Sequence, residues 1–192
     1  ANLQVEVPMG GETERELEFA ILDGSVSTVV IAGANSGDGA VELAEAYGLP
    51  IFAEPSSGSR FGDNAILSYP KLLVDEPELA SRIGRVIVFG KPTLSRTITR
   101  LFFSEHIEVV VVRSPNMGLF DVSRRASMFV DEVTFDVDVD GEWLEAWRVA
   151  DQKIQLSTPV SEKLGRREIV EQVWSATEAT DNLFLGASRM IR

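Results

Sequence analysis

The chain has 192 residues, of which 44% are hydrophobic and 25% charged, with 15 glycines, 8 prolines and no cysteine. This composition supports a packed core and excludes collagen-like, disulfide-stapled and intrinsically disordered chains. The 18 basic residues are outnumbered by 30 acidic ones, so the net charge is −12, which repels phosphate backbones and excludes nucleic acid as an expected partner. No apolar run approaches the roughly 20 residues of a membrane span, and the lack of cysteine fits a cytoplasmic location.

The first 24 residues show no clean hydrophobic period and include Pro8, Gly10 and Gly11, which predicts an extended linker or terminus over residues 1–26. The chain begins with alanine and ends shortly after a Gly-Ala-Ser turn that follows an apolar run. We therefore expect a piece of a larger protein.

From residue 27 onward, short continuous apolar runs alternate with segments of helical spacing. Residues 28–32 predict a strand buried on both faces, and residues 39–47 predict a helix that ends at Gly48. The same unit recurs, with strands expected at 49–53, 85–89 and 108–112, and helices at 69–74, 77–83 and 95–104. Strands separated by helices favour parallel pairing with right-handed crossovers. The predicted fold is α/β, a doubly wound (Rossmann-like), mostly parallel sheet.

The later part of the chain is less regular. Trp143 and Trp147 lie on one face of a helix expected over 142–155. The other expected elements are strands at 128–130, 133–135 and 183–185 and a helix at 167–176. The Ser-Thr-Pro break at residues 157–159 predicts the end of a central α/β domain that covers 27–157. A linker helix and the start of a further domain are expected over 158–192.

One glycine-rich turn resembles two kinds of cofactor site. The glycine-rich turn over 33–39 lies between a strand and a helix, as a phosphate-binding loop would, but it lacks both the dinucleotide spacing and a Gly-Lys-Ser/Thr end. Its Gly-Asp-Gly part also imitates the start of a thiamine diphosphate motif, with Asn64 at about the right distance. Because Pro55, Gly58 and Gly62 make the intervening stretch a loop, we interpret that likeness as accidental.

Acidic residues alternate with hydrophobic ones over 131–142. This alternation favours a strand with one wet, charged face that discourages edge pairing, rather than a calcium site. His106 lies near an expected helix C-terminus, where an imidazole is favourable for electrostatic reasons alone.

The basic residues are informative because they are scarce. Lys91 and Arg96 flank the turn after the third strand of the repeat, and Arg113 follows the fourth. Doubly wound sheets bind ligands in the loops at the carboxyl ends of their strands, and arginine grips a carboxylate through two hydrogen bonds. A small anionic ligand is therefore the hypothesis, against the plainer interpretation of solvated surface cations. Ser188 and Arg192 present the same chemistry after the last expected strand.

Several stretches together resemble the central part of 2-succinyl-5-enolpyruvyl-6-hydroxy-3-cyclohexene-1-carboxylate synthase (SEPHCHC synthase), a family of menaquinone biosynthesis. They are Pro-Ile-Phe-Ala-Glu-Pro-Ser-Ser-Gly at 50–58, Asn-Ala-Ile at 64–66, Leu-Leu at 72–73, Val-Ile-Val-Phe-Gly-Lys-Pro-Thr-Leu-Ser-Arg at 86–96, and Leu-Phe-Leu-Gly-Ala-Ser at 183–188 with Ile191 and Arg192.

The resemblance implies a three-domain transferase in which the first and third domains hold thiamine diphosphate and Mg²⁺ across a homodimer or homotetramer interface. It implies that the parent decarboxylates 2-oxoglutarate and adds the product to isochorismate. Ser95, Arg96, Ser188 and Arg192 would bind substrate, although Ser95 stands where the family often has a basic residue. The resemblance places no catalytic, cofactor or metal residue in this segment, so the segment alone is expected to be inactive.

Two alternatives remain at this stage. Lys91 and Arg113 could form a regulatory anion site of a ligand-sensing module. The sheet could also belong to a nucleotide- or flavin-binding domain of an electron-transfer protein or of another thiamine diphosphate enzyme.

Overall fold

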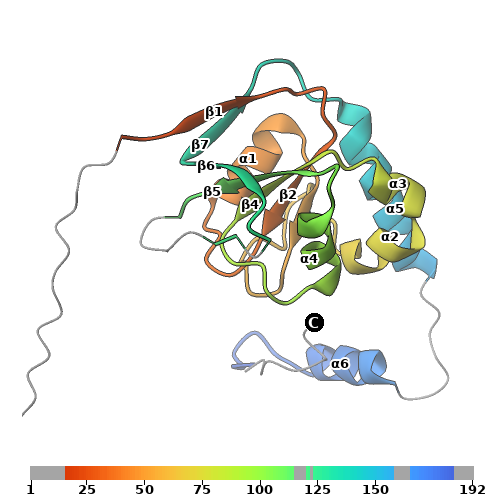
Figure 1. The fold of residues 1–192 in the computed structure, drawn as a ribbon. Helices are drawn as coiled ribbons and strands as arrows, with labels where there is room; N and C mark the ends of the chain where they lie inside the picture. Colours follow the sequence, from red (N-terminus) through yellow and green to blue (C-terminus); the bar gives the residue numbers. More distant parts are fainter. Residues whose placement is uncertain (1–15, 115–119, 122, 158–164, 184–192) are drawn as a thin grey trace, which may run out of the picture.

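The computed structural model describes residues 16–114, 120–121, 123–157 and 165–183. Its centre is a five-stranded sheet whose neighbouring strands all pair in parallel (Figure 1). The strands are β2 (Thr28–Ala32), β3 (Ile51–Ala53), β4 (Arg85–Phe89), β5 (Glu108–Val112) and β6 (Ala126–Val130), in the order β3-β2-β4-β5-β6. This confirms the doubly wound α/β fold that the alternating pattern predicts.

Each central strand is buried on both faces, because alternate side chains enter two separate hydrophobic cores. Along β2, Val29 and Ile31 enter the core that packs against the helices α2 (Tyr69–Asp75), α4 (Arg96–Phe103) and α5 (Gly141–Ser157). Val30 and Ala32 enter the core under α1 (Gly39–Tyr47). Figure 1 shows α2, α5 and the short α3 (Pro77–Ser81) gathered on one side of the molecule. The sheet is therefore sandwiched between two layers.

Two tryptophans of α5 are the largest side chains of the first core. Trp143 and Trp147 are 1% and 0% exposed, and their ring centroids lie 5.7 Å apart. Trp147 also meets the Phe52 ring edge-on at 4.9 Å, and Trp143 Nε1 donates to Thr28 O at 2.8 Å. Trp174, on α6 (Arg166–Ser175), is instead 70% exposed. The predicted tryptophan face of residues 142–155 is thus a core face, which α5 buries against the sheet.

The structure differs from the sequence prediction at the N-terminal part. Residues 19–22, expected within a linker, form the strand β1 (Phe19–Leu22), which pairs in parallel with β7 (Glu132–Phe135). Two carboxylates frame this pair, since Asp131 Oδ2 accepts from Glu18 N at 2.8 Å and Asp136 Oδ1 accepts from Gly24 N at 3.3 Å. The pair covers the same face of the five-stranded sheet as α1.

The charged stretch after residue 131 also departs from the prediction. Its strand ends at Phe135, and its edge is paired by β1 rather than kept free. Val133 is buried at 8% exposure in the second core, which explains why this short part is ordered as a strand. Residues 138–140 have no regular structure before α5 begins.

The remaining boundaries agree closely with the predictions. Helix α4 runs from Arg96 to Phe103, Ser95 is its N-cap, and His106 lies in the turn that follows. Of the strand expected at 183–185, only Leu183 lies within the described residues, and it has no regular structure. No helix in the described ranges is long and apolar enough to cross a membrane.

Candidate functional site

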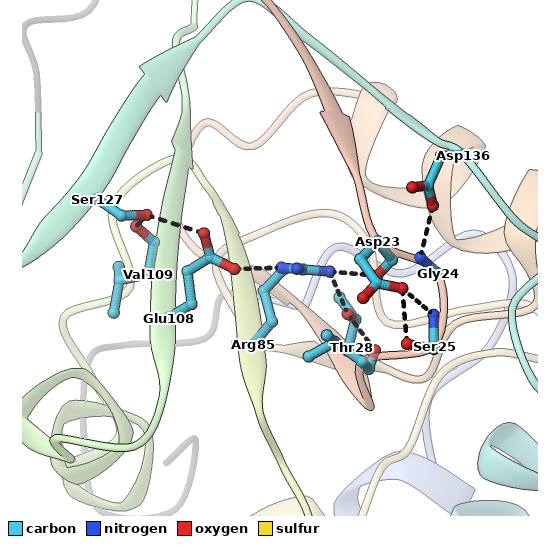
Figure 2. A network of polar contacts seen from close by, with 10 residues as sticks. Asp23, Gly24, Ser25, Thr28, Arg85, Glu108, Val109, Ser127 and Asp136 are labelled. Atoms are coloured by element: carbon cyan, nitrogen blue, oxygen red, sulfur yellow. Dashed lines mark hydrogen bonds and ion pairs between the residues drawn. The ribbon is translucent and has the colours of Figure 1, made fainter.

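The amino ends of the central strands are joined by a polar network, shown in Figure 2. Arg85 at the start of β4 donates through Nε to Glu108 Oε2 at 2.6 Å, and through Nη1 to Asp23 O at 2.8 Å. Thr28 Oγ1 lies 3.4 Å from the same Nη1, and the other carboxylate oxygen of Glu108 accepts from Ser127 Oγ at 3.4 Å. Because Arg85 is only 5% exposed and its charge is paired, this edge of the sheet is structural.

The carboxyl ends of β2 and β4 form the point at which the strand order reverses, where doubly wound folds open a ligand crevice. Here backbone fills the crevice. Ala34 N donates to Lys91 O at 3.2 Å and Lys91 N donates to Ala34 O at 2.9 Å. A Cβ on Gly33 would lie 2.1 Å from Pro92 N, and one on Gly90 would lie 2.5 Å from Ala34 O. The ends of β2 and β4 are therefore held together by close backbone contact.

A buried carboxylate shapes the next loop. Glu54 follows β3 and is 0% exposed. Its Oε1 accepts from the backbone N–H groups of Leu94 and Ser95, both at 2.8 Å, and its Oε2 accepts from that of Thr93 at 2.9 Å. Hydrogen bonds to a charged acceptor are the strong ones. Glu54 therefore fixes the backbone that leads directly into Arg96.

A hollow of about 410 Å³ opens beside this loop. It is lined by Pro55, Arg60, Leu67, Tyr69, Pro70, Leu94, Ser95, Arg96 and Thr97. Among the described residues, those that line the hollow include two arginines and no acidic residue. Its volume lies within the roughly 300–1,000 Å³ of small-molecule sites. Ser95 and Arg96, which the sequence predicts to bind substrate, thus lie at a cavity suited to an organic anion.

The walls of the hollow are held from distant parts of the chain. Asp151 on α5 accepts from the backbone N–H groups of Leu67 and Ser68 at 3.3 and 2.7 Å, which anchors the start of α2. Tyr69 stacks on Phe52 with ring centroids 5.2 Å apart. Burial, followed by the nearby negative charge of Glu54, raises the pKa of Tyr69 to about 12. The Tyr69 hydroxyl therefore keeps its proton at neutral pH.

Ser95 itself is occupied within the protein. Its hydroxyl accepts from Ile98 N at 3.4 Å as the helix cap, and it lies 2.8 Å from Thr97 Oγ1. It also hydrogen-bonds with the side chain of Tyr69. Arg96, by contrast, is exposed and has no carboxylate partner among the described residues. The cation is therefore the better ligand-binding group of the two.

The other predicted cations are placed differently. Arg113 Nη1 lies 3.2 Å from Glu18 Oε2 and 3.6 Å from Asp131 Oδ2, so two carboxylates compensate its charge. The backbone of Lys91 forms the Ala34 bridge, while its side chain is half-buried outside the residues that line the hollow. Within the described part of the chain, no hydrogen bond or ion pair joins Lys91 and Arg113 into one site. Ser188 and Arg192 lie outside the described residues.

The Gly-Asp-Gly turn does not assemble the donors of a magnesium–diphosphate site. The side-chain amide of Asn64 donates to Ala44 O at 2.7 Å and to Leu49 O at 2.9 Å, so it binds the C-terminal end of α1. Across the described ranges, no three acidic or histidine side chains cluster as metal ligands would. The residues that the structure describes therefore do not fit thiamine diphosphate.

Sequence reasoning missed Glu54, Arg60 and Asp151. Each lies in an ordinary local context, and the backbone N–H groups that the two carboxylates bind are 39 or more residues away along the chain. The one available signal was the turn chemistry of residues 54–60, where a buried glutamate follows a fully buried strand.

Comparison with known proteins identifies relatives of a single kind. The chain is 40% identical over 182 residues to the SEPHCHC synthase of a Nocardioides species, covering 86% of this chain and 33% of that protein. It is 34% identical over 205 residues to that of Leifsonia xyli, covering 86% of this chain and 34% of the relative. The Renibacterium salmoninarum enzyme is 30% identical across 100% of this chain and 33% of its own length. No protein-family model matches the chain.

The chain spans about one third of the length of the relatives. The fold agrees with the doubly wound domain that the family resemblance implies. By this homology, the chain belongs to the SEPHCHC synthase family.

Proposed function

We propose that this chain is the central segment of a thiamine diphosphate- and Mg²⁺-dependent transferase that decarboxylates 2-oxoglutarate and adds the product to isochorismate in menaquinone biosynthesis. The relatives' names supply the product, the family resemblance supplies the reaction, and the chain supplies one side of the proposed site. Arg96 is the residue through which this segment acts. Ser188 and Arg192 would add further substrate contacts, the cofactor would be held by parts that precede and follow the segment, and the whole would work as a homodimer or homotetramer in the cytoplasm.

One observation carries this proposal. Arg96 stands at the rim of a cavity beyond the carboxyl ends of the strands, on a loop that Glu54 fixes by three backbone hydrogen bonds. Both proposed substrates carry carboxylates, which a guanidinium binds through paired hydrogen bonds. An anchored loop holds that guanidinium in place, so less conformational entropy is lost when a substrate binds.

The test is a graft. The corresponding third of the Nocardioides relative is replaced by this chain, and product formation is measured with both substrates, thiamine diphosphate and Mg²⁺. We expect an active hybrid, in which Arg96→Ala lowers kcat/KM by about 10- to 100-fold, the loss expected for hydrogen bonds to a charged group. Arg100→Ala is the matched control, because Arg100 is an exposed arginine on the same helix that does not line the hollow.

A hybrid that folds but forms no product would contradict the assignment, as would an Arg96→Ala hybrid with unchanged kinetics. The 192-residue chain alone is expected to form no product under the same conditions. Product formation by the isolated chain would show that the catalytic groups lie within it.

The ligand-sensing alternative receives less support. It requires Arg113 to bind an anion, whereas Glu18 and Asp131 already surround its guanidinium. A calorimetric titration with a hydroxynaphthoate, repeated with Lys91→Ala, tests it directly. Saturable heat that disappears in the variant would restore this alternative.

A further inference from the structure

The hollow beside α4 contains a second cation that the family resemblance does not assign. Arg60 lines it together with Arg96, and the lining set includes no aspartate or glutamate. In a chain with 30 acidic and 18 basic residues, a cavity with two arginines and no carboxylate is unexpected on composition alone. Neither guanidinium has a carboxylate partner within the described part of the chain. The charge of the lining residues is therefore available to a ligand.

Arg60 is held on a structured loop. Its Nη1 donates to Ala53 O at 3.0 Å, which orients the guanidinium against the end of β3. Three buried serines fasten the loop itself. Ser57 Oγ donates to Glu54 O at 2.7 Å and accepts from Ser59 N at 3.0 Å, and Ser59 Oγ lies 3.1 Å from Ser36 Oγ.

Glu54 also fixes the backbone that leads into Arg96. The carboxylate of Glu54 binds the backbone N–H groups of residues 93–95, while its backbone N–H donates to Ala32 O at 2.9 Å. The backbone that carries Arg60 and the backbone that carries Arg96 thus share one buried anchor. Their relative placement is fixed by the fold, as a binding site requires.

The chemistry of the walls restricts the ligand further. The residues that line the hollow together with the arginines include the apolar side chains of Pro55, Leu67, Pro70 and Leu94. A guanidinium pairs best with a planar carboxylate, and apolar walls favour a carbon skeleton over a strongly hydrated inorganic ion.

We propose that Arg60 and Arg96 together form a subsite for a small organic dicarboxylate, with Arg60 as a substrate-binding residue in addition to Arg96. The identity of the ligand rests on the proposed function, whereas the subsite itself rests on the cavity and its two arginines.

The experiment titrates the isotopically labelled 192-residue chain with 2-oxoglutarate and follows backbone and arginine side-chain resonances by NMR. We expect saturable shifts at residues 60 and 96 with a dissociation constant in the millimolar range. Arg60→Ala and Arg96→Ala should each weaken binding by about tenfold, the effect of losing charge-assisted hydrogen bonds. Acetate, which carries one carboxylate, should bind more weakly than 2-oxoglutarate and lose less affinity in either variant.

Two further variants keep the result interpretable. Arg60→Gln retains a donor for Ala53 O but removes the charge, so it should fold as the parent does and still lose affinity. Arg100→Ala removes an exposed arginine of α4 that lies outside the hollow, and should leave affinity unchanged within about twofold.

The proposal is overturned if no saturable binding occurs, if Arg60→Gln binds as tightly as the parent, or if Arg100→Ala loses as much affinity as Arg60→Ala. The outcome is separable from the proposed function. Dicarboxylate binding through both arginines in a chain whose graft is inactive would leave the subsite standing and remove the enzymatic assignment. An active graft whose activity is unaffected by Arg60→Gln would leave the enzymatic assignment standing and remove the proposed subsite.

Discussion

Glu54→Gln tests whether one buried carboxylate organises the candidate site. The carboxylate of Glu54 accepts hydrogen bonds from three backbone N–H groups, with nitrogen-to-oxygen distances of 2.8–2.9 Å. A glutamine can keep its oxygen toward Leu94 and Ser95, but its NH₂ group must then face the N–H of Thr93. Two charge-assisted bonds become neutral, with a loss of about 1 kcal/mol each, and one donor loses its partner, at a further cost of about 1–3 kcal/mol.

Thr93 is exposed, so water can satisfy part of the lost bond and the lower end of that range applies. The expected loss of unfolding free energy is therefore about 3 kcal/mol, a large part of the about 5–15 kcal/mol of a typical domain. The assay is urea unfolding of the 192-residue chain. Amide hydrogen exchange at residues 93–95 gives a local measurement and should accelerate more than at the central strand β4.

Glu105→Gln is the matched control, because Glu105 is an exposed glutamate in the turn after α4, and the change should alter stability by less than about 0.5 kcal/mol. The reasoning fails if Glu54→Gln is as mild as the control and exchange at residues 93–95 is unaltered. In that case the loop would be fixed by its own turn chemistry, and Glu54 would not set the position of Arg96.

Three other outcomes follow from the packing. Gly33→Ala should prevent stable folding, because its Cβ would lie 2.1 Å from Pro92 N, whereas Gly141→Ala meets nothing within 4 Å and should be tolerated in the same unfolding assay. Trp147→Ala should cost about 3–5 kcal/mol and Trp174→Ala less than about 0.5 kcal/mol, since the two side chains are 0% and 70% exposed; equal losses would contradict the core assignment. Burial raises the pKa of Tyr69 to about 12 from 10.0, so between these pH values the unfolded chain has released a proton that the folded chain keeps, and stability falls as pH rises. Tyr69→Phe should remove this alkaline loss and the late phase of the phenol absorbance titration, and a wild-type titration without that late phase would contradict it.

The edge of the sheet that carries the candidate site could be located from the sequence because it depends on a local rule. Lys91, Arg96 and Arg113 each follow a strand, and carboxyl ends of parallel strands share one edge. What the rule does not give is the state of each cation. Arg96 lines a cavity, whereas Arg113 is neutralised by Glu18 and Asp131, one from before β1 and one from before β7. That difference depends on contacts between segments that are far apart in the chain, such as Arg113 with Glu18, for which a single sequence offers no local signal.

The strand β1 shows the same limit on a larger scale. Residues 19–22 and 132–135 have short patterns that fit many arrangements, and they form a sheet only because parallel pairing joins them over the core under α1.

The largely apolar runs at 28–32, 85–89 and 108–112, separated by helical segments, determined by themselves that this chain forms a parallel sheet buried on both faces. The hydrophobic pattern of these runs and the spacing between them are local properties, so they can be identified from consecutive residues of the sequence. The tertiary structure alone decided that Glu54 anchors the loop of Arg96, that Asp151 caps α2 and that Arg60 shares the hollow. Those groups are brought together by long-range packing, which no local pattern of residues specifies.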